Sequence, residues 1–147
     1  MLMNASTYQI QSGSWTELEH HAKLIRSEVF IQEQNIAEHD EWDVQDAVSL
    51  HFIVYDQNQP IATARLLENN SIGRVAVLKP YRGKGIGQLL MQQIIQIAKD
   101  QKRSQLKLSA QVYATKFYEN LGFQLSGEEY LDCGIPHIDM SMNILEN

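Results

Sequence analysis

Apolar residues recur at helical spacing in two segments of the chain. The first segment begins at a capping box, in which Ser14 can cap a helix and Glu17 can reach back to it. Apolar residues spaced three and four apart then mark one helical face, at Leu18, Ala22, Ile25 and Val29. The second segment shows the same spacing at Ile86, Leu90, Ile94 and Ile97. A shorter helix is predicted over residues 111–120, where Gly122 follows as a stop signal.

Short runs rich in β-branched and aromatic residues, separated by turn residues, predict strands. They cover residues 8–11, 50–55, 61–67, 75–78, 106–109 and 123–125. A last strand is expected over 138–144, where apolar and polar residues alternate strictly. Strands cluster first and then alternate with helices, and no linker or repeat interrupts the chain. The pattern therefore predicts one α+β domain over residues 1–147, built on a central mixed sheet.

Residues 33–47 carry many carboxylates around Trp42, and we expect a loop with a short helix there. The acidic side chains from Glu38 to Asp46 could recognise a cation, but a solvated loop is the simpler interpretation.

Composition and charge narrow the class of protein. With 12 basic and 18 acidic residues the net charge is −6, which argues against nucleic acid as a partner and is compatible with a cationic substrate such as an amine. No apolar run approaches the ~20 residues of a membrane span. Residues 1–6 lack a basic region and an apolar core, so no signal peptide is expected. A single cysteine, Cys133, allows no internal disulfide, and cytoplasm is the expected location.

The segment 74–87 indicates a phosphate-binding loop. A β-branched run ends before Pro80, which cannot donate to a sheet ladder, and Arg82–Gly87 then leads directly into the second helix. Backbone N–H groups at such a helix start have no partner of their own, and the helix dipole adds partial positive charge. The glycines let a phosphate approach the backbone, and Arg82 and Lys84 add full charges. The sequence therefore predicts a phosphorylated cofactor.

Two motifs indicate which cofactor this is. The loop is not a Walker loop, and counting Gly-x-Gly-x-x-Gly from Gly83 puts Gln88 in place of the third glycine. It matches Arg-x-x-Gly-x-Gly, which resembles the pyrophosphate loop of the GNAT superfamily of acyl-CoA-dependent N-acyltransferases. Residues 114–123 are close to the GNAT pattern Ala-x-x-Phe-Tyr-x-x-x-Gly-Phe. Residues 29–34, 72–75 and 132–137 are similar to the ElaA-type branch of these proteins.

The resemblance implies a fold and a cofactor. It implies a central, mostly antiparallel sheet flanked by helices, whose fourth and fifth strands, 71–78 and 105–109, splay to admit the pantetheine arm of acetyl-CoA. The residues expected to contact the cofactor are Val75, Ala76, Val77, Arg82, Gly83, Lys84, Gly85, Ile86, Gly87, Gln111 and Tyr118. GNAT proteins often have Asn where this chain has Gln111.

The resemblance also implies roles in acetyl transfer. Tyr118 aligns with the tyrosine that protonates the departing thiolate, and the N–H of Val77 would polarise the thioester carbonyl. The amine must lose a proton, for which Glu33 and His137 are the candidate bases and a water chain is the alternative. No metal is expected: His20 and His21 point about 100° apart on a helix, and the other histidines lack ligand spacing.

The leading hypothesis is an acetyl-CoA-dependent N-acetyltransferase that acts directly on a primary amine of a small molecule or protein. A non-catalytic acyl-CoA-binding module is the alternative, and nucleotide or dinucleotide binding is a third hypothesis. The expected assembly is a monomer or a homodimer, without membrane partners. No motif identifies the acceptor.

Overall fold

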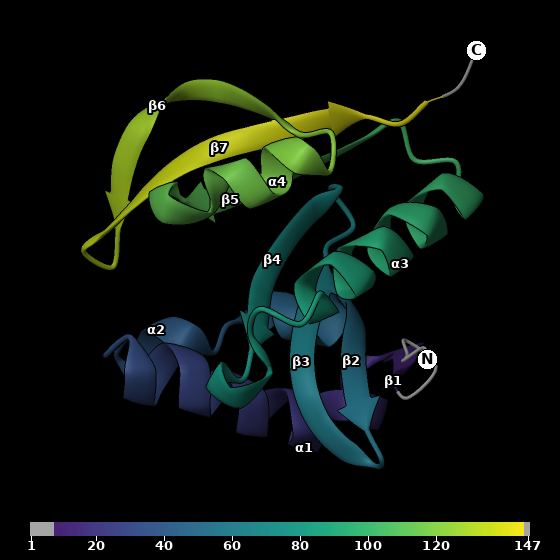
Figure 1. The fold of residues 1–147 in the computed structure, drawn as a ribbon, viewed down its shortest axis with the longest axis vertical. Helices are drawn as coiled ribbons and strands as arrows, with labels where there is room; N and C mark the ends of the chain where they lie inside the picture. Colours follow the sequence, from purple (N-terminus) through teal and green to yellow (C-terminus); the bar gives the residue numbers. More distant parts are fainter. Residues whose placement is uncertain (1–7, 146–147) are drawn as a thin grey trace.

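The computed structural model describes residues 8–145, so the expectation about a signal peptide in residues 1–6 lies outside the described residues. Its centre is one seven-stranded sheet with the order β1-β2-β3-β4-β5-β7-β6 (Figure 1). The strands are β1 (Tyr8–Gly13), β2 (Leu50–Asp56), β3 (Gln59–Leu66), β4 (Ser71–Val77), β5 (Gln105–Gln111), β6 (Gln124–Asp132) and β7 (Ile135–Asn143). All neighbouring pairs are antiparallel except β4 and β5, which are parallel.

Helices cover the sheet unevenly. The α-helices are α1 (Trp15–Arg26), α2 (Glu38–Glu41), α3 (Ile86–Asp100) and α4 (Thr115–Asn120). A π-helical segment η2 (Ser27–Glu33) continues α1, and short 3-10 turns form η3 (Val44–Val48), η4 (Lys79–Tyr81) and η5 (Val112–Ala114). The buried residues of α1 pack with Ile53, whereas those of α3 pack with Phe52 and Val54, so the two helices lie on opposite faces of the sheet.

The fourth and fifth strands separate soon after they meet. Only Ser71 and Ile72 of β4 pair with β5, opposite Lys107 and Leu108. Beyond these pairs the strands diverge, and Figure 1 shows β4 with β1–β3 on one side of the opening and β5 with β6 and β7 on the other. This confirms the splayed, mixed α+β sheet that the GNAT resemblance implies.

A bulge accompanies the divergence. On β3 the paired residues step from Thr63 to Arg65, while on β4 they step from Ala76 to Gly73. The extra β4 residue leaves Arg74 in the left-handed region at φ 53°, which is uncommon for a residue with a side chain. A bulge bends its strand, and this one follows directly after the last β4 residue that pairs with β5.

Several predicted boundaries were wrong. The strand predicted over 123–125 runs as β6 to Asp132, and β7 begins at Ile135 instead of Ile138. Every residue of the edge strand β6 is exposed, so its sequence lacks the alternation by which half-buried strands are recognised. The helix predicted over 111–120 starts as the 3-10 turn η5, and the first helix changes to π geometry after Arg26.

The acidic segment was also interpreted wrongly. It contains the expected short helix, α2, but its carboxylates are not simply solvated. Glu41 and Asp46 are 2% and 3% exposed and pair with arginines. A buried carboxylate remains charged only with such partners, and the arginines come from distant parts of the chain, where sequence spacing does not reveal them.

Candidate active site

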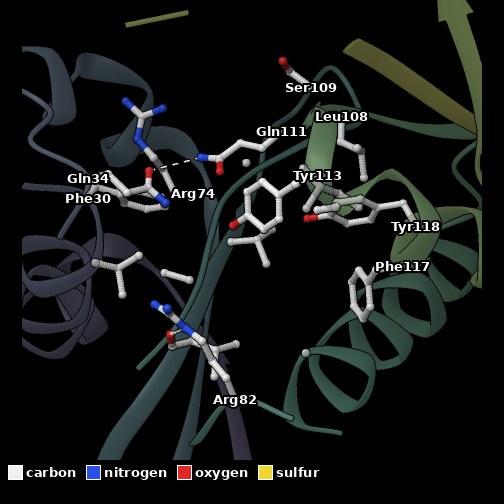
Figure 2. Close-up of a pocket in the computed structure, with 18 of the residues that line it drawn as sticks. Phe30, Gln34, Arg74, Arg82, Leu108, Ser109, Gln111, Tyr113, Phe117 and Tyr118 are labelled. Carbon is white, nitrogen blue, oxygen red and sulfur yellow. Dashed lines mark hydrogen bonds between the residues drawn. The ribbon is translucent and has the colours of Figure 1, made fainter. Parts of the chain in front are cut away.

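A cavity of about 660 Å³ fills the opening between β4 and β5 and reaches both faces of the sheet. From the α3 face it is lined by the glycine loop, α3, Phe117 and Tyr118, and from the α1 face by Phe30, Gln34, Arg74 and His137. Figure 2 shows Phe30 and Gln34 across the opening from Tyr118. The cavity lining includes every predicted cofactor residue except Lys84, whose ammonium lies 5.8 Å from the ring centre of Tyr81.

The glycine loop forms what we call the loop end of the cavity, Arg82–Gly87 and the start of α3. Gly83 and Gly85 adopt left-handed φ angles of 76° and 80°, and an added Cβ would meet nothing within 4 Å at either position. Gly85 caps α3, and the first helical bond runs from the Leu89 N–H to the Gly85 carbonyl. The N–H groups of the first turn therefore have no helical acceptor and are available to an anion.

Arg82 stands at this end but already holds protein partners. Its two terminal nitrogens donate to the two carboxylate oxygens of Glu33 at 2.7 and 2.8 Å, and its Nε donates to the Val77 carbonyl at 2.9 Å. The Arg82 guanidinium lowers the pKa of Glu33, so that carboxylate is a weaker base than a free one. Glu33 is not among the cavity-lining residues and reaches the cavity through Arg82.

The edge of β4 offers a free donor to the cavity. The Leu78 N–H donates to the Ile61 carbonyl of the neighbouring β3, so by strand alternation the N–H and carbonyl of Val77 point to the other edge. At that edge β5 has already diverged, and no strand of the described residues pairs with Val77 from that side. The Val77 N–H is thus placed to donate to a ligand.

Tyr118 enters the cavity from α4 and packs between two other rings. Its ring lies edge-on to Phe117 and to Phe123, with centroids 5.0 and 6.1 Å away. The side chain is 9% exposed, and burial raises the pKa of its phenol to about 12. Figure 2 shows the hydroxyl pointing into the cavity beside Tyr113. The phenol therefore keeps its proton at neutral pH and can donate it.

His137 and Gln111 line the α1 side of the same opening. The Nδ1–H of His137 donates to the Ile135 carbonyl at 2.7 Å, which leaves the Nε2 lone pair of the neutral ring free to accept a proton. The amide of Gln111 donates to the Gln34 side-chain oxygen at 3.1 Å, the dashed line in Figure 2. Gln111 thus spans from β5 to the end of η2.

The opposite end of the cavity, which we call the ion-pair end, is walled by Asp40, Glu41 and Arg74. Arg74 donates to the Glu41 carbonyl at 2.8 Å and pairs with the Glu41 carboxylate at 3.1 Å. Sequence analysis missed Arg74 and Glu41 as cavity residues. The only local signal was an arginine beside a glycine within a predicted strand.

Behind this wall lies a buried network of charges. Arg26, itself 1% exposed, donates to Glu41 at 2.7 Å and to both oxygens of Asp46 at 2.8 and 3.1 Å. Arg65 reaches Asp46 and also Asp43, whose pKa its hydrogen bonds lower to about 2. Burial raises the pKa of Glu41 in spite of its arginine partners. The network fixes α2 and η3 against the sheet.

Metal ligands and membrane spans also bear on the class of site. Among residues 8–145, no group of three or more His, Cys, Asp or Glu side chains is arranged to hold a metal ion. None of the helices in that part of the chain is long and apolar enough to cross a membrane. The thiol of Cys133 is exposed at the lining of the cavity.

Comparison with known proteins identifies the class. A protein-family model described as an acetyltransferase (GNAT) domain matches residues 16–144, and the chain belongs to this family. Within it, the chain is similar to YyaT of Bacillus subtilis, with 38% identity over 87% of this chain and 90% of the relative. It also resembles ElaA of Escherichia coli, with 29% identity over 90% of this chain and 97% of that one.

Solved structures agree with these relatives. A crystal structure described as an N-acetyltransferase of Lactobacillus plantarum superposes with a TM-score of 0.86 at 27% identity, covering 95% of this chain and 99% of that one. The crystal structure of Escherichia coli ElaA superposes with a TM-score of 0.83 at 28% identity, covering 92% and 99%. The predicted likeness to the ElaA-type branch is thereby confirmed.

Proposed function

We propose that this chain transfers an acetyl group from acetyl-CoA directly to a primary amine. The observation that carries the proposal is the cavity through the splayed sheet, lined at one end by the unpaired N–H groups that begin α3 and elsewhere by Val77 and by the buried, protonated phenol of Tyr118. The pyrophosphate would bind at Arg82–Gly87, and the pantetheine would lie along the free edge of β4. Holding both substrates together supplies most of the rate.

In this mechanism the chemical groups have separate tasks. The Val77 N–H donates to the thioester carbonyl as it becomes an oxyanion. The amine attacks the carbonyl carbon, the C–S bond breaks, and the Tyr118 hydroxyl donates its proton to the CoA thiolate. The pKa of Tyr118 is compatible with this role, because the phenol stays protonated at neutral pH and its proton is available.

We propose His137 as the base that removes the proton of the amine. It lines the cavity, and its Nδ1 hydrogen bond leaves Nε2 free. Glu33, the other candidate, has less support because Arg82 holds both of its oxygens and lowers its pKa. Deprotonation through a water chain is the alternative to both.

A non-catalytic acyl-CoA-binding module is the competing function. It would need the loop end of the cavity but not the Tyr118 hydroxyl, whose burial next to a ligand cavity costs solvation energy. Thiol release from acetyl-CoA in the presence of amines separates the two functions, since a binding module releases none.

Two matched variants test the cofactor site. Gly85 and Gly127 both have left-handed φ angles, of 80° and 89°, and an added Cβ meets nothing within 4 Å at either. Only Gly85 lines the cavity. Saturating CoA should raise the melting temperature of the wild type and of Gly127→Asp, but not of Gly85→Asp, where a carboxylate would repel the phosphate. A wild type that shows neither a shift nor calorimetric binding would overturn the proposal.

A further inference from the structure

A second cavity, of about 540 Å³, adjoins the first at the point where β4 and β5 diverge. Both cavities are lined by Ile72 and Gly73 of β4 and by Leu108 and Ser109 of β5. The second cavity extends away from Tyr118, past the paired part of the two strands, and is lined mainly by polar side chains. These are Arg65, Ser71, Gln105, Lys107, Ser109, Ser126, Asp139 and Ser141.

These polar residues share one face of the sheet. Along β5, Leu106, Leu108 and Ala110 are buried in the core beneath α3, so Lys107, Ser109 and Gln111 point to the opposite face. On the adjoining strand, Ser141 and Asp139 pair with Lys107 and Ser109 and point the same way. A polar strip therefore runs from the acetyl-transfer cavity into the second cavity.

The charges along this strip are ordered. At the point where the strands diverge, Asp139 accepts from the Tyr130 hydroxyl at 2.6 Å, and Tyr130 also bonds Ser109. Two residues further along β5 stands Lys107, which is exposed and makes no ion pair with any of the described residues. The carboxylate of Asp139 thus lies next to the first cavity, and the unpaired ammonium of Lys107 lies farther from it.

A buried donor without a partner lies nearby. The Arg65 side chain is 6% exposed, and its Nε–H has no hydrogen-bond partner among the described residues. It borders the second cavity, and a Cβ added at Gly73 would lie 3.9 Å from this nitrogen. Because buried donors are normally satisfied, one without a protein partner favours an acceptor on that side of Arg65.

We propose that the second cavity binds an oxyanion, carboxylate or phosphate, at the far end of the amine acceptor. This inference rests on the proposed acetyl transfer and names its acceptor class: a primary amine with an anionic group about 7–13 Å away, the length of two to four strand residues. The ammonium end passes Asp139 and reaches His137, and the oxyanion pairs with Lys107. Gly73 leaves the passage between the two cavities open.

The probe is ε-aminocaproate, compared with its uncharged amide, ε-aminocaproamide, and with β-alanine, which is too short to reach Lys107. We expect the wild type to acetylate ε-aminocaproate with at least tenfold higher kcat/KM than its amide and to show no such advantage for β-alanine over its own amide. Lys107→Gln should reduce that ratio of kcat/KM values by about tenfold, because the variant loses one charge-assisted hydrogen bond. Lys99→Gln, an equal charge change on the exposed face of α3, should keep it.

A second variant tests the passage rather than the charge. The backbone of Gly73 is not in the left-handed region, and its Cβ position is free of close contacts, so Gly73→Val should fold. It should lower kcat/KM for ε-aminocaproate while the CoA-induced rise in melting temperature persists. A wild type that acetylates the amide as efficiently as the carboxylate, or a Lys107→Gln variant that keeps the preference, would overturn the proposal.

Binding is also measured without turnover, so that the two proposals fail separately. Calorimetry of ε-aminocaproate into CoA-saturated protein should show binding that Lys107→Gln weakens and Lys99→Gln does not. If no amine releases thiol but this binding pattern holds, acetyl transfer is wrong and the oxyanion site stands. If amines are acetylated but the carboxylate binds no better than its amide, the oxyanion site is wrong.

Discussion

The loop end of the cavity consists mainly of main-chain groups from one continuous segment, whereas the ion-pair end is walled by charged side chains of α2 and β4. A network of charged side chains from α1, β3 and residues 43–46 lies behind that wall. At the loop end, Gly83 and Gly85 expose N–H groups that any anion of suitable shape can approach. At the ion-pair end, Arg26, Arg65 and Arg74 bind Glu41, Asp43 and Asp46, and the position of each group depends on all the others.

The two ends differ in how far they depend on particular side chains. A backbone loop keeps its function while most side chains around it vary, because the ligand is bound by main-chain N–H groups. An ion-pair network is specific to its own set of side chains, and it costs desolvation energy that only complete pairing offsets. The end at which we propose that acyl-CoA binds is therefore built locally, and the ion-pair end is built by long-range contacts.

The largest expected effect comes from breaking the network. Arg26→Met leaves Glu41 and Asp46 without their main partner, and loss of one member of a buried ion pair costs about 3–5 kcal/mol of unfolding free energy. Urea unfolding followed by circular dichroism measures this. Lys99→Met, on exposed helix surface, is the control and should change stability by less than about 0.5 kcal/mol.

The same variant tests whether the two ends are independent. Folded Arg26→Met should still show a CoA-induced rise in melting temperature, since Arg26 touches no residue of the loop end. If the substitution costs under about 1 kcal/mol, or abolishes the CoA effect, the contrast between the ends does not hold.

The next effect concerns Tyr118. Tyr118→Phe keeps the ring packing with Phe117 and Phe123 but removes the proton, and loss of a general acid lowers the maximal rate by about 100-fold or more. The apparent affinity for acetyl-CoA should change little. Because the phenol pKa is about 12, the decline in rate caused by its ionisation should begin only as the pH approaches that value. If the variant keeps wild-type turnover, Tyr118 is not the general acid and has only a packing role.

A pair of variants distinguishes the candidate bases. His137→Gln should lower turnover by about 10- to 100-fold and leave acetyl-CoA affinity unchanged. Glu33→Gln should mainly weaken acetyl-CoA binding, because Glu33 fixes the Arg82 guanidinium at 2.7 and 2.8 Å. Steady-state kinetics across pH measure both. The opposite pattern, a strong loss of turnover in Glu33→Gln with unchanged acetyl-CoA affinity, would make Glu33 the base.

The smallest effect is a pH dependence of the network. Arg65 lowers the Asp43 pKa from 3.8 to about 2, so the stabilising contribution of Asp43 is complete above pH 3.8 and is lost as the pH falls through 2. The raised pKa of Glu41 works in the opposite direction, since its contribution is lost as the pH rises. As the pH falls from 3.8 to 2, the unfolding free energy of Asp43→Asn should decrease less than that of the wild type. The difference between the two decreases should be under about 1 kcal/mol.

The control for that measurement is Glu128→Gln, an exposed carboxylate of β6 that pairs with none of the described arginines. Urea unfolding at a series of acidic pH values compares the two variants with the wild type. Equal slopes for Asp43→Asn and the wild type would show that the network does not depend on the Asp43 charge.

The sequence by itself determined the family, the mixed α+β sheet and the loop end of the cavity. These features rest on local rules: helical spacing at Leu90 and Ile94, alternation at Met140 and Met142, and glycines where the chain must turn under a helix. Such rules act between residues a few positions apart, so the order of residues suffices to read them. These rules did not predict the extent of the edge strand β6, because all of its side chains are exposed and no alternation of apolar and polar residues is required there.

Only the tertiary structure decided the ion-pair end, the Arg82–Glu33 pair and the passage at Gly73. Arg26 meets Asp46 across 20 residues, and Arg82 meets Glu33 across 49. Whether a charged side chain ends in solvent or in a buried pair depends on which elements the sheet brings together. Spacing along the chain does not encode that choice, because burial and electrostatic pairing are properties of the packed molecule.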